Sequence, residues 1–301
     1  MDHPQRPVFA LLLRTGGALS FATMMLLIKL TGESGVSLPE IMFWRQFLTV
    51  PLVLGFLSLT GGLARLKTGK LGTHAWRSVI GMAGMVFNFG GVLLLPLAES
   101  TTLGFTTPLF VVVIAALVLR EPIGPWRWAA VALGFAGVLV IAQPGNAPIS
   151  LLGTSALLLA ALTTACVSFL IRDMSRTEEP IRIVFYFSLF GSAMMVPLLP
   201  FTMAAHDSWQ WLLLAGIGLC GMAGQLFITA ALRLGAIASV VVMDYTSLIW
   251  ATLFGWLLWD HLPPWTTWLG APLIVAAGLT VAWREHRLAR PRSPVTAFEL
   301  E

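Results

Sequence analysis

The segment Gly81-Met82-Ala83-Gly84 occurs a second time as Gly221-Met222-Ala223-Gly224, and the two copies are 221 − 81 = 140 residues apart. Features further along the chain repeat at the same offset. Arg120-Glu121-Pro122 corresponds to Asp260-His261-Leu262, and a tryptophan-rich segment follows each of them. Because several features agree in the same order, the sequence predicts an internal repeat that covers most of the chain.

The composition indicates a surface that faces lipid. Hydrophobic residues make up 57% of the 301 residues and charged residues 11%, where about 25% charged residues is usual in soluble domains. This is too few charges to cover a soluble globule, and too much apolar area for a disordered chain. Two Cys in 301 residues exclude a disulfide scaffold, and both, Cys166 and Cys220, lie in apolar runs and are interpreted as small buried residues. No cleavable signal peptide is expected, because the first apolar run, from Val8, continues past Leu27.

Ten apolar runs are long enough to cross a membrane. The hydrocarbon core of a bilayer is about 30 Å thick and requires about 20 mostly apolar residues in a helix. The runs lack the polar alternation of barrel strands, so they are predicted to be helices. The predicted spans are 8–30, 38–59, 76–96, 100–119, 126–143, 151–171, 181–200, 209–230, 236–259 and 265–283.

Each copy of the repeat contains five predicted spans. An odd number of spans inverts the second repeat relative to the first, which is an arrangement typical of secondary transporters. The predicted fold is therefore an all-α membrane protein with ten transmembrane helices in two inverted five-helix repeats. Residues 1–146 are predicted to form the first repeat, residues 147–290 the second, and residues 291–301 a cytoplasmic tail.

The positions of Lys and Arg predict which way the spans run. With the N-terminus inside, 18 − 2 = 16 of the 18 Lys and Arg residues lie on or near the inner side. The other two, Lys29 and Arg45, lie near the outer ends of the first two spans. Lys and Arg gather on the cytoplasmic side of membrane proteins. The chain is therefore predicted to be a multi-pass protein of the cell inner membrane with both termini in the cytoplasm.

Several short segments occur in a characteristic order along residues 8–283. They are Ile28-Lys29-Leu30, Pro39 to Arg45, Pro108-Leu109-Phe110, and Leu119-Arg120-Glu121-Pro122 followed by Gly134 and Gly137. In these segments the chain resembles the EamA type of the drug/metabolite transporter superfamily. It departs from the family's pattern at Ser20-Phe21-Ala22, where the family has Trp-Gly, and at Ser247-Leu248 and Asp260-His261-Leu262, which replace a Pro and a Gly-Glu-Pro.

The resemblance implies a central cavity between the repeats, bounded mainly by the first, third, fourth, sixth, eighth and ninth spans. It also implies export of small metabolites by alternating access. The chain is most similar to bacterial exporters of aromatic and other amino acids, so these are the expected cargo. A drug or nucleoside efflux carrier of the same fold is the alternative.

Asp244 is the deepest charged residue of the predicted spans. It lies about eight residues into the ninth span, or about 12 Å from its inner end. A charge at mid-helix costs about 2.5–3.5 kcal/mol on insertion scales, so such residues have a partner or line a water-filled cavity. Asp244, with Tyr245 beside it, is predicted to bind a substrate ammonium or a proton. The alternative is a salt bridge to a neighbouring helix, with Arg233 as a candidate partner.

Other polar residues at membrane depth are weaker candidates for substrate contact. Asn88 and Gln225 carry amides that need hydrogen-bond partners in hydrocarbon, and substrate contact and interhelical bonding are equally open. Thr107, Ser20 and Thr164 are further candidates, although Ser and Thr often bond their own helix.

Four residues are predicted to take part in gating. Pro108 removes a helix hydrogen bond and predicts a kink in the fourth span. Arg45 either binds a substrate carboxylate in a bidentate manner, anchors the first two spans to each other, or extends toward the outer surface. Lys29 and Glu99 fit an ion-pair gate on the outer side.

The sequence does not favour an enzyme. The five histidines fall in loops or at helix ends, and no H-E-x-x-H, P-loop or Gly-x-Ser-x-Gly motif occurs. No catalytic residue, metal or cofactor is therefore predicted, and without an ATP-binding motif the energy is expected to come from a solute or proton gradient. The expected partners are a small-molecule substrate and the lipid bilayer. No nucleic-acid partner is expected, and the predicted state is a monomer.

Overall fold

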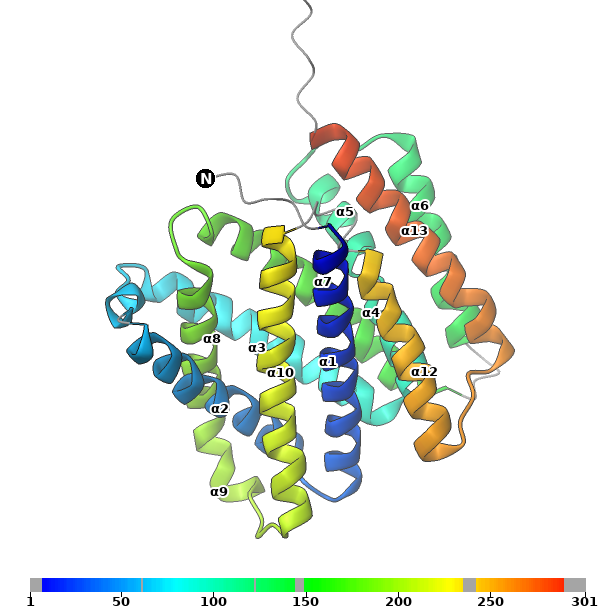
Figure 1. Cartoon of the computed structure of the whole chain (residues 1–301). Helices are drawn as coiled ribbons and strands as arrows, with labels where there is room; N and C mark the ends of the chain where they lie inside the picture. The colour runs from blue at the N-terminus through cyan, green and yellow to red at the C-terminus, as the bar shows by residue number, and fades with distance from the viewer. Residues whose placement is uncertain (1–6, 61, 122, 144–148, 235–241, 290–301) are drawn as a thin grey trace, which may run out of the picture.

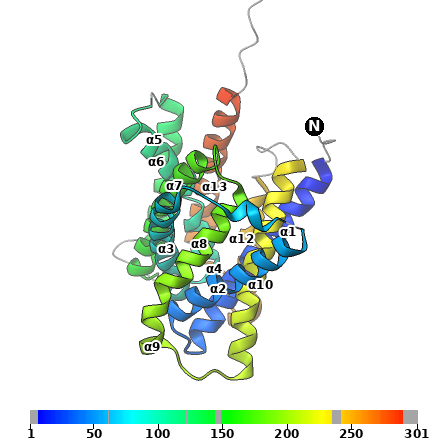
Figure 2. The same cartoon turned by 90° about the vertical axis from the view of Figure 1, so that its left-hand side faces the viewer.

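The computed structural model describes residues 7–60, 62–121, 123–143, 149–234 and 242–289, and its regular structure within these ranges is entirely helical. The helices form one bundle, with the long α1 beside α10 and α13 beside α6 (Figures 1 and 2). The elements from the first half of the chain are α1 (Pro7–Glu33), α2 (Leu38–Leu59), η1 (Leu63–Leu66), α3 (Leu71–Leu94), α4 (Leu97–Gly104), α5 (Thr107–Leu117) and α6 (Pro125–Ala142).

The second half provides the same series of spans. Its elements are α7 (Leu151–Met174), α8 (Pro180–Met195), η2 (Val196–Leu198), α9 (Leu199–Thr202), α10 (Ser208–Leu234), η3 (Val242–Tyr245), α12 (Thr246–Trp259) and α13 (Trp265–Ala289). We call the side of the bundle where α1 begins the Pro7 face and the side where it ends the Glu33 face.

The structure agrees with the predicted all-helical membrane fold. Within the described residues, nine helical stretches are long and apolar enough to cross a bilayer. The predicted ninth span, 236–259, is described from residue 242 onward as η3 and α12, and its first residues lie outside the described ranges. The chain is therefore a multi-pass membrane protein.

The helices end where the sequence provides a local reason. The fourth predicted span is divided into α4 and α5, and Pro108 lies in the first turn of α5, where the missing N–H of proline costs nothing. Gln143 ends α6 and Asp260 ends α12 with a left-handed backbone, at φ of 38° and 50°. A left-handed residue directly after the last turn is a common way to stop a helix.

The packing follows the repeat. α1 packs most extensively against α10 and α3 against α7, while α2 packs against α8 and α6 against α13. Exchanging the two repeats converts the α1–α10 contact into the α7–α3 contact. The same exchange maps the α2–α8 and α6–α13 contacts onto themselves. The contacts are thus those expected of two equivalent halves.

The repeated glycines explain how the equivalent helices approach each other. A Cβ atom on Gly84 of α3 would lie 2.7 Å from Thr163 of α7, and one on Gly224 of α10 would lie 2.9 Å from Phe21 of α1. Small residues allow helices to pack closely in lipid, where the hydrophobic effect does not drive association. The two copies of the repeated segment therefore make corresponding contacts in the two halves.

Candidate functional site

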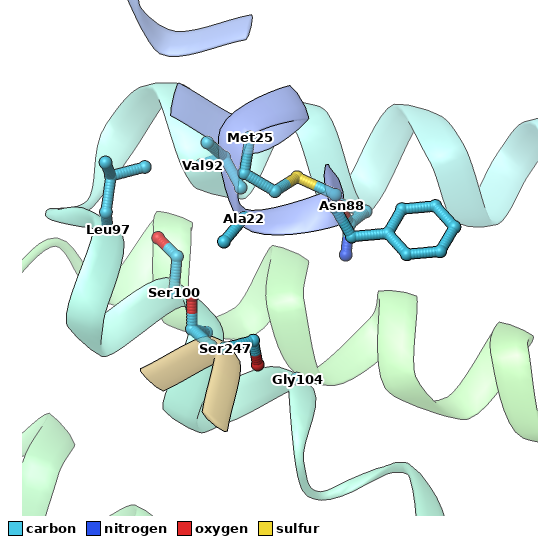
Figure 3. Close-up of a pocket in the computed structure, with 10 residues that line it drawn as sticks. Ala22, Met25, Asn88, Val92, Leu97, Ser100, Gly104 and Ser247 are labelled. Carbon is cyan, nitrogen blue, oxygen red and sulfur yellow. The ribbon is translucent and has the colours of Figure 1, made fainter. Parts of the chain in front are cut away.

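A cavity of about 150 Å³ lies between elements of both halves. α1, α3 and α4 come from the first half of the chain and α12 from the second (Figure 3). Most of the lining is apolar or small. The lining residues are Phe21, Ala22, Met25, Asn88, Val92, Leu97, Ser100, Thr101, Gly104 and Ser247.

The polar groups that line the cavity are the amide of Asn88 and the hydroxyls of Ser100, Thr101 and Ser247. The Asn88 side-chain oxygen is buried and has no hydrogen-bond partner among the described residues. The Ser100 hydroxyl donates its proton to the Pro96 carbonyl at 2.9 Å, and the Ser247 hydroxyl donates to the Asp244 carbonyl at 2.6 Å. Their oxygens keep free lone pairs, because a hydroxyl has one donor and two acceptor positions. The two hydroxyls can therefore accept hydrogen bonds from a ligand, while the Asn88 amide has both a donor and an acceptor.

The cavity contains some of the residues that the sequence singles out. Asn88 lines it, and Ser247, three residues after Asp244, contributes from α12. Figure 3 shows Ser100 and Ser247 across the space from Ala22 and Met25. Ser100 and the apolar wall formed by Phe21 and Met25 are not singled out by the sequence, because nothing in a uniformly apolar span marks which residues face inward.

Asp244 is paired with an arginine of the first helix. It lies in the 3₁₀ turn η3 directly before α12, and residues 236–241 of the predicted span lie outside the described ranges. The Arg14 Nε atom donates to Asp244 Oδ1 at 2.5 Å, and Arg14 Nη2 donates to Oδ2. The pair is thus bidentate and joins α1 to the second half of the chain. The side chain of Arg233, the candidate partner from the sequence, lies outside the described side chains.

The residues predicted to form an outer gate gather at the Glu33 face. A second cavity of about 260 Å³ is lined there by both halves of the chain. Lys29 Nζ donates to the Leu95 carbonyl at 2.8 Å and lies 5.8 Å from the ring of Trp259, whose indole N–H donates to Glu33 at 3.0 Å. The lining residues are Lys29, Glu33, Pro96, Leu97, Gly255, Trp259 and His261.

Glu99 is fully buried beside this second cavity and contacts the other half of the chain. Thr267 of α13 donates a hydrogen bond to its Oε1 at 3.3 Å, and His261 Nε2 lies 3.8 Å from the same oxygen. Glu99 lies in the first turn of α4, where the helix dipole stabilises a negative charge. Lys29 and Glu99 are therefore close to the same cavity, but each bonds to a different partner.

Several predicted residues lie away from the lining of the central cavity. Thr107 donates to the Gly104 carbonyl at 2.9 Å, and Ser20 donates to the Gly16 carbonyl at 2.8 Å. The ring of Tyr245 packs against Phe105, with 4.8 Å between the ring centroids. Thr164 and Gln225 have exposed side chains on α7 and α10.

Within the described ranges, no group of three or more His, Cys, Asp or Glu side chains lies close enough together to hold a metal ion.

Comparison with known proteins identifies the family. The EamA-like transporter family matches this chain over residues 8–143 and again over residues 151–283. The chain belongs to the EamA-like transporter family. It is accordingly a small-molecule transporter and not an enzyme.

Named relatives show the range of cargo among similar proteins. A riboflavin transporter of Rhizobium johnstonii is 31% identical over 257 residues, which cover 84% of this chain and 82% of the relative. The pseudopaline exporter CntI of Pseudomonas aeruginosa is 29% identical over 275 residues, covering 90% and 95%. An S-adenosylmethionine uptake transporter of Rickettsia prowazekii is 24% identical over 248 residues, covering 82% and 84%. These relatives are not aromatic amino-acid exporters.

A solved crystal structure supports the fold of this EamA-like chain. It is 21% identical, covers 94% of this chain and 100% of the solved one, and superposes with a TM-score of 0.62. At this identity the likeness concerns the fold alone.

In this EamA-like transporter the two family-matched segments are joined by polar contacts at both faces. At the Pro7 face, Arg65 donates a hydrogen bond to Glu179 at 2.7 Å. Thr68 donates one to Glu178 at 2.9 Å. Near the Glu33 face, Glu40 of α2 pairs with His206 before α10. The cavity that contains Asn88 is lined by both segments as well.

Proposed function

We propose that this chain exports small amphiphilic metabolites by alternating access of its two repeats, with aromatic and other neutral amino acids as the first cargo. The observation that carries the proposal is the central cavity, which is built from both repeats. Its apolar wall and its hydrogen-bond acceptors suit a molecule with an apolar part and an ammonium group.

The site residues follow from this geometry. Asn88, with Ser100 and Ser247, binds the cargo ammonium, while Phe21 and Met25 contact its apolar side chain. Tyr245, Gln225, Thr107, Ser20 and Thr164 stay candidates for contact in another state of the cycle. The gate is formed by the four residues that the sequence predicts for it, Lys29, Glu99, Arg45 and Pro108.

The Pro7 face is proposed to be cytoplasmic. The excess of Lys and Arg on this side supports the orientation. The protein then lies in the inner membrane as a monomer with both termini in the cytoplasm, the second repeat inverted relative to the first. The Arg14–Asp244 pair closes the cytoplasmic side in this conformation and must separate when cargo enters.

A second cargo class is favoured by the relatives. Riboflavin and S-adenosylmethionine both contain a heteroaromatic ring system, and S-adenosylmethionine also contains an amino-acid group. A nucleoside, or a cationic drug that contains a heteroaromatic ring, is therefore the second candidate for this cavity.

The experiment that tests the proposal is uptake into proteoliposomes that contain the purified protein. Labelled phenylalanine, tryptophan, methionine and threonine are each supplied with and without an imposed pH gradient. Saturable uptake without the gradient identifies facilitated transport, and dependence on the gradient identifies proton coupling, for which Asp244 is the candidate group. If no amino acid moves while labelled riboflavin or a nucleoside does, the amino-acid cargo is wrong and the second class replaces it.

The contribution of Asn88 is tested in the same system. Asn88→Leu keeps a similar volume but removes the buried acceptor, and a hydrogen bond to a charged group contributes about 1.5–3 kcal/mol. The expected result is a rise in KM for phenylalanine of about tenfold or more. Ser168→Ala on the exposed side of α7 is the matched control and leaves KM unchanged. An unchanged KM in Asn88→Leu removes Asn88 from the site.

A further inference from the structure

Two arginines inside the bundle have no carboxylate partner among the described residues. Arg45 lies on α2 and Arg77 on α3, and 9% of the Arg77 surface is exposed. The Nε atom of Arg45, and the Nε and Nη1 atoms of Arg77, are buried and have no hydrogen-bond acceptor within the described part of the chain. Neither residue takes part in an ion pair there.

The two guanidinium groups are linked through a few shared neighbours. Arg45 Nη1 donates to the side-chain oxygen of Gln46 at 2.7 Å, and Gln46 donates to the Phe187 carbonyl at 3.3 Å. The Arg77 guanidinium lies over the Phe187 ring, 3.8 Å from its centroid. Gln46 and Phe187 thus connect the two guanidinium groups in one set of contacts.

Arg45 also contacts two residues of α3. Its Nη1 is 4.0 Å from the Met85 sulfur, and its guanidinium carbon is 5.9 Å from the centre of the Phe89 ring. These two residues flank Asn88 on α3. The two arginines therefore lie along α3, Arg45 at Met85 and Phe89 and Arg77 nearer the Pro7 face.

The neighbours of the pair do not neutralise it. A buried guanidinium without a counter-charge is strongly unfavourable, and buried charges in proteins are normally paired. The Phe187 ring provides one cation–π contact and Gln46 one neutral acceptor, so the net charge of the pair remains. A carboxylate near this end of α3 is Glu178, which lies 3.5 Å from His74, and His74 is one helical turn before Arg77. Glu178 is already bonded to Arg182 and Thr68.

We propose that Arg45 and Arg77 form a binding site for an anionic group, a carboxylate or a phosphate, carried by the transported molecule. A guanidinium presents N–H groups in a planar fork that matches both anions. The inference rests on the proposed function, because it assigns a charge to the cargo. With the acceptors around Asn88, it describes a cargo that has an ammonium group at one end and an anionic group at the other.

The test measures binding and does not depend on transport. Purified full-length protein in detergent is heated with inorganic phosphate, with phenylalanine, or with phenylalaninamide, which lacks the carboxylate. A ligand that binds only the folded protein raises its unfolding midpoint. The expected result is a rise of about 3 °C or more with phosphate and with phenylalanine, and a smaller rise with phenylalaninamide.

The variants identify the site. Arg45→Gln and Arg77→Gln are expected to abolish the phosphate response while they unfold at or above the midpoint of the ligand-free wild type, because each removes an unpaired charge, partly buried at Arg45 and buried at Arg77. Arg172→Gln, at an exposed position of α7, is the control and keeps the full response. Arg45→Lys and Arg77→Lys keep the charge and are expected to keep part of the response to phosphate. If a Gln variant does not fold, the reduced response of the Lys variant tests the same site.

Nanodiscs distinguish a soluble anion from a lipid headgroup. If phosphate stabilises the protein in pure phosphatidylcholine discs, the site takes a soluble anion. If only added phosphatidylglycerol stabilises it, and both Gln variants lose that effect, the same site takes a lipid phosphate.

The proposal is overturned if both Gln variants respond to phosphate as the wild type does, or if the wild type responds to no anion. Because transport is measured separately, a failure of the anion-site proposal can be distinguished from a failure of the proposed amino-acid cargo. A wild type that moves amino acids without any anion response contradicts only this inference. If the wild type transports no amino acid but responds to the anion, and the Gln variants do not respond, only the proposed cargo is contradicted.

Discussion

At the scale of single residues, the bidentate contact between Arg14 and Asp244 has the clearest energetic consequence. Arg14 is 9% exposed and Asp244 36% exposed at their side chains. Removing one partner leaves the other charge partly buried. Breaking such a pair costs about 1–3 kcal/mol, between the values for exposed and for buried ion pairs. The contact therefore stabilises the conformation in which α1 is joined to η3.

Asp244→Asn is predicted to insert into the membrane but to lower the unfolding midpoint by about 2–8 °C and to impair transport. The reason is that Arg14 keeps its charge and loses its counter-charge. Thermal unfolding in detergent and uptake into proteoliposomes measure the two effects.

The matched controls are Arg14→Gln and the double variant. If the two residues act through their contact, the double variant is less destabilised than the sum of the single changes. Additive effects show that the contact contributes nothing, and normal transport kinetics in Asp244→Asn remove Asp244 from the mechanism.

The sequence identifies some of these residues but not their partners. Asp244 is recognisable as a charge in an apolar span, and Asn88 as a buried amide. The partner of Asp244 is 230 residues away in the sequence, and no local pattern connects Arg14 to it. Arg77 lies at the beginning of a span and is counted there with the other basic residues of that side. Only the tilt and packing of α3 show that it is buried.

At the scale of helices, α6 and α13 meet through a reciprocal glycine contact. A Cβ atom on Gly137 would lie 2.8 Å from the Gly270 carbonyl oxygen, and one on Gly270 would lie 2.7 Å from the Gly137 carbonyl oxygen. The obstructing atoms are backbone atoms, so a rotamer change cannot relieve the clash. The two helices must separate if either glycine is replaced.

Gly137→Leu is therefore predicted to destabilise the protein, with a loss of about 1–3 kcal/mol or more, as for overpacked sites. Fluorescence-detected size-exclusion chromatography after heating measures the unfolding midpoint. Gly55→Leu on α2 is the control, because no atom lies within 4 Å of a Cβ at that position. Equal midpoints for the two variants contradict the close approach of α6 and α13.

The helices themselves were largely predictable. The second span is predicted at 38–59 and observed as Leu38–Leu59, because hydrophobic length and proline position locate its ends. The fourth span is predicted to have a kink at Pro108. The structure instead has an interruption at Phe105 and Thr106, between α4 and α5. Residues 236–241 of the predicted ninth span lie outside the described ranges.

At the scale of the whole molecule, the loops at the Pro7 face connect the repeats through Glu178. Burial by itself raises the pKa of Glu178, but hydrogen bonds and charge from Arg182, Thr68 and His74 outweigh burial and hold the pKa below its ordinary value of 4.5. A carboxyl group whose pKa is lowered by folding stabilises the protein above its unfolded pKa. This contribution is lost as the pH falls through the folded pKa.

Glu178→Gln is thus predicted to lower the unfolding midpoint by several degrees at pH 7, because charge-assisted hydrogen bonds are lost. The difference from the wild type should narrow as the pH falls below about 4.5 and disappear when Glu178 is protonated in both states. Thermal unfolding over a pH series measures it. Glu121→Gln, at an exposed position after α5, is the control with no such trend. A difference that does not change with pH contradicts the assignment.

The orientation of the bundle is predicted from charge and can be measured by labelling. In a background without Cys166 and Cys220, Ala205→Cys is expected to react with a membrane-impermeant maleimide in intact cells. Gly69→Cys is expected to react only after lysis. Both positions are exposed, so reactivity depends on the side of the membrane. The opposite pattern reverses the proposed topology.

The Arg14–Asp244 contact has no equivalent in the other repeat. At the repeat offset of 140 residues, or the 151 − 8 = 143 at which the two family matches begin, Arg14 corresponds to a position within 154–157 and Asp244 to one within 101–104, and none of these residues is charged. Two identical halves would make the inward-open and outward-open states mirror equivalents with equal free energy, and an empty carrier would spend half its time in each. One uncompensated ion pair removes that degeneracy. In the proposed alternating-access cycle the pair does not set the direction of net flux, which the gradients fix, but it biases the compartment from which a resting carrier is loaded.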